Sequence, residues 1–186
     1  MSGGRLDGTK VLAIVTNYGV EQDELTVPVE RLRDDGADVE IAAPSREPIR
    51  TLVGDEKPGD VVEPTETLGE VDPAGYDLLL IPGGALNADN LRMDDDALEI
   101  IRSFASSGRP VAAICHAPWA LVEADVVKGK NVTSYMSLKT DLGNAGASWQ
   151  DSPEVTDKTG YTLITSRTPK DLEPFLDAIE RELTPV

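Results

Sequence analysis

Short apolar runs alternate with amphipathic stretches along most of the chain. Four runs rich in Val, Ile, Leu and Ala are typical of strands buried on both faces, and they lie at Lys10–Thr16, Asp38–Ala43, Tyr76–Ile81 and Val111–Ile114. Apolar residues recur at helical spacing from about Asp23 to Asp35, where Gly36 follows, and again over Leu98, Ile101 and Phe104. Strands that alternate with helices predict an α/β fold with a mostly parallel sheet covered on both sides.

The rest of the chain continues this pattern with shorter elements. We expect helices at Pro118–Ala124, Leu138–Gly143 and Pro169–Leu183, and strands at Lys130–Ser134, Ala147–Gln150, Glu154–Thr156 and Tyr161–Thr165. Residues 44–74 have little apolar periodicity and predict a surface excursion, with short strands at Arg50–Val53 and Asp60–Glu63. The length favours one domain over 1–186, in which residues 1–9 form a flexible N-terminus.

Charge and composition narrow the classes of function. Asp and Glu number 34 against 17 Lys and Arg, which gives a net charge of −17. Such a surface repels phosphate backbones and anionic lipid, so we expect no nucleic-acid partner and no membrane. The acid excess fits either ordinary solubility or adaptation to a halophilic, high-salt cytoplasm, and we favour the second interpretation. One cysteine cannot form an internal disulfide, and the chain lacks a signal-like start, so a cytoplasmic location is expected.

The only cysteine and the only histidine are adjacent, as Cys115 and His116, directly after a predicted buried strand. A buried cysteine is more often an inert small hydrophobe. At a strand-to-helix turn, however, a thiol projects from the sheet edge near a helix N-terminus, which favours the thiolate. Neighbouring residues in regular structure do not face each other, so a Cys–His contact requires a tight, irregular turn and a third group to orient the imidazole.

Two further features lie where ligands bind in such sheets, beyond the carboxyl ends of the strands. Gly83 and Gly84 follow the third strand and fit either a tight turn or an oxyanion pocket made by backbone N–H groups. Glu21 and Glu24 follow the first strand, where acids are commonly solvated near a helix start. If that loop lies beside the cysteine, one of these glutamates hydrogen-bonds the thiol.

These residues amount to a resemblance. The segments IPGG, AICHAPWAL, TSYMSLKTDLGNAGASW and TSRTPKDLEPF, in this order, resemble the PfpI/ThiJ family, the intracellular-protease and stress-protein branch of the class-I glutamine-amidotransferase-like superfamily. The resemblance covers nearly the whole chain. It implies a flavodoxin-like sandwich with a nucleophile elbow and a homo-oligomer. No set of residues in the sequence suggests a metal or a cofactor such as a nucleotide or flavin, so we expect neither.

The resemblance also assigns roles. It implies Cys115 as nucleophile, His116 as its partner and Glu24 against the thiol, with Glu21 also pointing toward the site. Backbone N–H groups of Gly84 and of Ala117 or His116 form the oxyanion pocket, beside Gly83. A neighbouring subunit supplies the acid that orients the histidine, and Asp89 matches it best. Two positions depart from the family pattern, because Ala117 replaces a common Gly and Asp89 a common Glu.

The resemblance favours a cysteine-dependent hydrolase, a peptidase or deglycase acting on a peptide or small carbonyl substrate in stress protection. The alternatives are a cofactor-independent glyoxalase acting on α-oxoaldehydes and a non-catalytic redox sensor in which Cys115 is oxidised reversibly. A glutamine amidotransferase is disfavoured because it requires a late histidine, and none follows His116.

Overall fold

A seven-stranded sheet forms the centre of the protein, as a computed structural model that describes residues 4–184 shows. The strand order is β11-β12-β8-β7-β1-β3-β6, and only the edge strand β11 runs antiparallel. The strands are β1 (Lys10–Ile14), β3 (Asp38–Ala43), β6 (Glu66–Thr67), β7 (Leu78–Ile81), β8 (Val111–Ile114), β11 (Glu154–Asp157) and β12 (Leu163–Ser166). The four apolar runs that predicted central strands therefore lie side by side.

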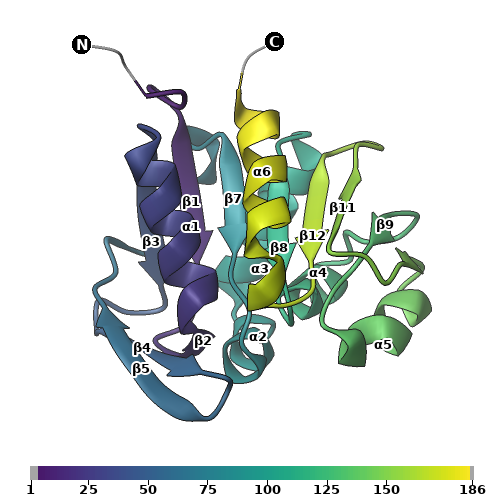
Figure 1. Ribbon diagram of the computed structural model, residues 1–186, viewed down its shortest axis with the longest axis horizontal. Helices are drawn as coiled ribbons and strands as arrows, with labels where there is room; N and C mark the ends of the chain where they lie inside the picture. The colour runs from purple at the N-terminus through teal and green to yellow at the C-terminus, as the bar shows by residue number, and fades with distance from the viewer. Residues whose placement is uncertain (1–3, 185–186) are drawn as a thin grey trace.

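Helices cover both faces of this sheet (Figure 1). On one face lie α1 (Gln22–Asp34) and α6 (Leu172–Leu183), and on the other α3 (Asp95–Ser106) and α4 (Pro118–Glu123). Within β1, Val11 and Ala13 pack toward the first pair, whereas Leu12 and Ile14 pack toward the second. The α/β sandwich predicted from the sequence is confirmed. Among the helices of residues 4–184, none is both long enough and apolar enough to cross a membrane.

Several small elements gather at the carboxyl ends of the parallel strands. A second sheet consists of β2 (Tyr18–Glu21), β4 (Ile49–Val53) and β5 (Lys57–Val62), and it lies next to α2 (Ala85–Leu91) (Figure 1). The pattern did not predict β2 or α2. The hairpin β4–β5 is more than a surface excursion, because Ile49 and Leu52 are buried. Beyond β8 lie the pair β9 (Asn131–Val132) and β10 (Ser148–Trp149), with α5 (Lys139–Asn144) between them.

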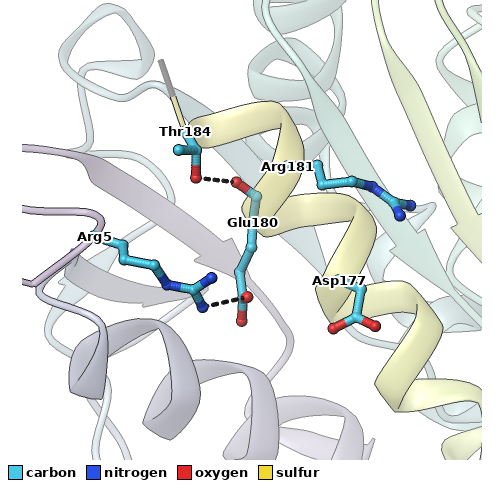
Figure 2. A pocket seen from close by; sticks show the side chains of 5 residues that line it. All are labelled: Arg5, Asp177, Glu180, Arg181 and Thr184. Atoms are coloured by element: carbon cyan, nitrogen blue, oxygen red, sulfur yellow. Dashed lines mark hydrogen bonds and ion pairs between the residues drawn. The ribbon is translucent and has the colours of Figure 1, made fainter. Parts of the chain in front are cut away.

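Residues 4–9, which belong to the segment expected to be flexible, contact the body of the protein in the structure. Leu6 is buried, and its N–H donates to the Asp35 carbonyl. Arg5 reaches Glu180 on α6 at 2.7 Å (Figure 2). The cavity drawn there is lined by four charged residues and Thr184, from near the two ends of the chain, and lies apart from the strand ends that carry the candidate site. Residues 1–3 lie outside the described residues.

Candidate active site

Cys115 lies in a strained turn directly after β8. Its φ of 64° places a non-glycine residue in the left-handed region, which costs about 1–2 kcal/mol. The turn is fixed on both sides, since the Cys115 N–H donates to Ser166 O at 3.0 Å and the Cys115 carbonyl accepts from Tyr135 N at 2.8 Å. Residues held in such a conformation cluster at functional sites. The predicted elbow is therefore present in the backbone.

The irregular turn brings the two adjacent side chains together. Cys115 Sγ lies 3.1 Å from His116 Nδ1, although neighbours in regular structure face apart. The imidazole is held between two aromatic rings: Tyr135 stacks on it at 4.5 Å between ring centroids, and Trp119 meets it edge-on at 5.3 Å. These two aromatic residues were not predicted to belong to the site. Tyr135 lies in the TSYMSLKTDLGNAGASW segment, but nothing in that segment alone indicates stacking on a histidine.

Glu24 is fully buried beneath the thiol. Its Oε1 accepts the Gly83 N–H at 3.0 Å, and its Oε2 has no hydrogen-bond partner among residues 4–184. Burial raises the pKa of Glu24 well above its usual range, and the Glu21 charge adds to this, while the Gly83 N–H and the Cys115 thiol oppose it. Burial therefore favours the protonated form of this carboxyl group. Its free oxygen can then donate that proton in a hydrogen bond to sulfur.

The backbone N–H groups around the thiol divide into free and occupied donors. Those of Gly84 and His116 face Cys115 and act to lower the pKa of its thiol. The Ala117 N–H instead donates to Ile114 O at 3.1 Å, and the Gly83 N–H donates to Glu24. Of the two alternatives left open for the second oxyanion donor, the geometry favours His116. Gly83 contributes by close approach, because a Cβ there would lie 2.8 Å from Cys115 Cβ.

The charge state of the thiol differs from the sequence-based expectation. Burial raises the pKa of Cys115, and the Asp55 charge adds to this, as does Glu24 whenever it is ionised; together they outweigh the two N–H groups. The helix that follows, α4, has only six residues, so its dipole is weak. Burial also lowers the pKa of His116, while Asp55 raises it. The resting site therefore holds a thiol beside a neutral imidazole that can accept its proton.

The resemblance implied that Glu21 points toward the site, and in the structure its carboxylate binds the tip of the β4–β5 hairpin. Its two carboxylate oxygens accept the N–H groups of Gly54 and Asp55 at 2.9 and 3.2 Å, which fixes the tip of the β4–β5 hairpin. Asp55 in turn accepts the Ala85 N–H at 2.8 Å. The hairpin thereby reaches the site, a placement that no local pattern in residues 44–74 indicated.

Asp89 lies exposed on α2, and no hydrogen bond among residues 4–184 joins it to His116. The structure thus does not bring it to the histidine within one chain. A neighbouring residue of α2 does support the site. Asn87 is buried, accepts the Thr16 N–H at 2.7 Å and donates to the carbonyls of Pro82 and Gly83, tying the end of β1 to the glycine turn.

No cluster of three or more His, Cys, Asp or Glu side chains suited to a metal ion occurs within residues 4–184. The polar groups around Cys115 are instead hydrogen-bond donors and one buried carboxyl group. Such a set suits a carbonyl group that gains negative charge on oxygen when sulfur attacks its carbon.

Known proteins align with this chain over almost its full length. The DJ-1/PfpI family profile matches residues 9–182. Protein/nucleic acid deglycase 2 of Escherichia coli is 38% identical over 168 residues, which cover 90% of this chain and 94% of that protein. Deglycase PfpI of Pyrococcus furiosus is 37% identical over 167 residues, or 90% of this chain and 95% of its own. General stress protein 18 of Bacillus subtilis is 33% identical over 89% of this chain and 93% of that protein.

Solved structures agree with the sequence relatives. The crystal structure of Drosophila melanogaster DJ-1beta superimposes with a TM-score of 0.83 at 30% identity, covering 95% of this chain and 90% of that one. The resemblance drawn from the quoted segments is therefore confirmed at the level of the family. On the strength of the profile match and of relatives aligned over nine-tenths of its length, the chain belongs to the DJ-1/PfpI family.

Proposed function

We propose that the protein is a cysteine-dependent hydrolase of the deglycase type, which removes an early carbonyl adduct from an amine. The observation that carries this proposal is the 3.1 Å contact between Cys115 Sγ and His116 Nδ1 at a strained elbow, with the N–H groups of Gly84 and His116 facing the sulfur. A nucleophile, a base and two oxyanion donors within one turn suit attack on a carbonyl group.

The first step follows from the resting charge state. As Sγ forms a bond to the substrate's carbonyl carbon, the carbonyl π electrons move to oxygen and the thiol proton passes to His116 Nδ1. The N–H groups of Gly84 and His116 then hold the oxyanion. Because burial lowers the pKa of His116, the imidazole is neutral and able to accept that proton at neutral pH.

The second step returns the proton. His116 gives it to the leaving nitrogen, the carbon–nitrogen bond breaks, and the amine departs. With a peptide amide this leaves a thioester, which water hydrolyses to a carboxylic acid. With a methylglyoxal adduct, sulfur takes the place of the amine on the aldehyde-derived carbon and a hemithioacetal results. His116, neutral again, then moves a proton from that carbon to the neighbouring ketone carbon, and water hydrolyses the resulting thioester to lactate. Burial favours the protonated form of Glu24, and in that form its unpaired Oε2 can donate a hydrogen bond to Sγ and stabilise negative charge on sulfur.

The names of the relatives include both activities: several are deglycases, and a second Bacillus subtilis relative, 38% identical, is named "Putative cysteine protease YraA". Those in Escherichia coli and Pyrococcus furiosus are called deglycases, and the first Bacillus subtilis relative a general stress protein. For an adduct of methylglyoxal and an amine, hydrolysis consumes one water and yields the free amine and lactate. Peptidase activity uses the same first step and belongs in the same test.

We also propose that the protein works as a homo-oligomer in which Asp89 of a neighbouring subunit orients His116. Two observations support this. Nδ1 faces the thiol, and no hydrogen bond among residues 4–184 occupies the other ring nitrogen. Asp89 is exposed on α2, available to another copy. The molecular mass in solution tests the idea, because a strictly monomeric protein with full activity contradicts it.

A glyoxalase is the second candidate, and the free Oε2 of Glu24 favours it. A thiol adduct of an α-oxoaldehyde becomes a thioester when a base moves a proton from the first carbon to the second. A buried carboxyl group next to sulfur suits that transfer once it is ionised.

Comparison of the wild type with Cys115→Ser on a substrate panel, in low and in molar salt, tests the proposal. The panel contains the methylglyoxal adduct of an acetylated lysine, a peptide amide and free methylglyoxal. We expect amine release from the adduct by the wild type and none by the variant. If the wild type exceeds the variant on none of the three, the hydrolase is refuted, and a gain of oxygen on Cys115 in mild peroxide then favours a redox sensor.

A further inference from the structure

Asp55 occupies the tip of the β4–β5 hairpin, at the edge of the candidate site. Its φ of 59° places it in the left-handed region, which aspartate tolerates better than most residues. Glu21 accepts its N–H, and its own Oδ1 accepts the Ala85 N–H at 2.8 Å. Ala85 directly follows Gly84, one of the two donors that face the thiol. Asp55 is exposed, and its backbone and its side chain are each held by one hydrogen bond next to the oxyanion pocket.

This carboxylate acts on the groups of the site. Its negative charge raises the pKa of Cys115, of His116 and of Glu24, so all three sense it. One cation, Arg92, lies beside an aromatic residue of the site and is itself paired with an acid. It lies over the Trp119 ring at 5.8 Å and pairs with Glu123 at 3.0 Å. A substrate that approaches Cys115 therefore meets a negative field.

We propose that Asp55 determines substrate specificity, by selecting carbonyl compounds and adducts that carry an ammonium or guanidinium group close to the reacting carbon and by rejecting those that carry a carboxylate there. This inference rests on the proposed function for its substrates. The effect of Asp55 on the charge of the site can be measured without turnover, so the role of Asp55 and the proposed function can be refuted separately.

Two methanethiosulfonate reagents of opposite charge measure the field at the thiol. One carries a trimethylammonium group and the other a sulfonate, and each forms a mixed disulfide with Cys115 and releases methanesulfinate. The chain has one cysteine, so mass spectrometry reports this site alone. At low ionic strength we expect the wild type to react faster with the cation, and Asp55→Asn to lower the cation-to-anion rate ratio about tenfold.

Matched variants separate this effect from net charge and from folding. Glu56→Gln removes one charge from the next residue of the same turn, where the side chain is exposed, and should leave the ratio within about twofold of the wild type. Asp55→Gly suits the positive φ, removes the charge and should match Asp55→Asn. If both Asp55 variants keep the wild-type ratio, or if Glu56→Gln lowers it equally, the proposal is wrong.

Turnover forms the second arm. The wild type should prefer the methylglyoxal adduct of a lysine-containing dipeptide over that of a glutamate-containing one, and Asp55→Asn should reduce this preference about tenfold in kcat/KM. A preference that Asp55→Asn leaves unchanged overturns the specificity role even if the reagent ratio shifts. If no adduct is turned over by the wild type, the proposed function fails, and the reagent ratio alone decides whether Asp55 sets the charge of the site.

Discussion

A methyl group added at Gly83 has no space to occupy. A Cβ there would lie 2.6 Å from Glu24 Oε1, 2.6 Å from Ile114 O and 2.8 Å from Cys115 Cβ. Two of these neighbours belong to the nucleophile and its buried acid, and the third is backbone of a central strand. The turn must therefore move away from β8 to accept the substitution Gly83→Ala.

The loss of folding free energy in Gly83→Ala has two contributions. Overpacking of a tight interior costs about 1–3 kcal/mol. Displacing the turn weakens the buried Gly83–Glu24 hydrogen bond, which adds about 1 kcal/mol. A total of about 2–4 kcal/mol lowers the Tm of a domain of this size by about 5–15 °C. A shift of the oxyanion donors by about 1 Å reduces kcat/KM about 100-fold.

Thermal unfolding and the rate of adduct hydrolysis measure both effects. Gly143→Ala is the matched control, since a Cβ there meets nothing within 4 Å and the residue lies in α5. It should raise the free energy of unfolding by up to about 1 kcal/mol and leave the rate unchanged. If Gly83→Ala melts within 2 °C of the wild type, roughly the resolution of such a comparison, and turns over normally, the packing described around Cys115 is wrong.

Three further predictions concern protonation. Glu24→Gln, which keeps an acceptor for the Gly83 N–H and a donor toward sulfur, should hydrolyse adducts within about tenfold of the wild type, whereas Glu24→Ala should lose about 100-fold. Loss of activity in both variants would contradict a hydrogen-bonding role for Glu24 and would show that its carboxyl group moves a proton. Because burial lowers the pKa of His116, the acidic limb of the pH profile of kcat/KM should lie below pH 6.5, and a limb above pH 6.5 would contradict this. His116→Ala should abolish that limb and lower kcat/KM about 100–1,000-fold. Asp157 is buried against Lys130; burial raises its pKa, but hydrogen bonds from Asn131, Thr159 and Lys130 hold that pKa well below the usual range, so Asp157 stabilises the fold fully above about pH 4 and less as the pH falls further. Asp157→Asn should lower the free energy of unfolding in urea by about 3 kcal/mol at pH 7 and should flatten its dependence on acid pH, and an unchanged dependence would refute this role.

The central strands were predictable because burial on both faces requires continuous apolar runs. Val111–Ile114 and Asp38–Ala43 match β8 and β3 to the residue. The short elements were not predictable in this way. In α2, the polar residue Asn87 is buried and makes hydrogen bonds to the ends of β1 and β7. A search for apolar residues at helical spacing does not find such a helix, because one of its buried positions is an asparagine.

The site shows the same division. Adjacency of Cys115 and His116 after a buried strand indicated the elbow, and the structure supplies the positive φ that joins their side chains. The expected lowering of the thiol pKa did not follow, because burial depends on the packing of several distant segments. Asp55 was missed for the same reason, since its position depends on how a hairpin docks and on the carboxylate of Glu21.

The rate of lactate formation from a preformed methylglyoxal adduct tests the central proposal most directly. The adduct also releases methylglyoxal spontaneously, so lactate is compared with that uncatalysed release, measured with an excess of a trapping thiol. We predict that the wild type forms lactate and free amine in equal amounts, faster than spontaneous release, and that Cys115→Ser forms neither above background. Lactate that never exceeds the spontaneous release, or that Cys115→Ser forms equally well, would contradict a Cys115-dependent deglycase.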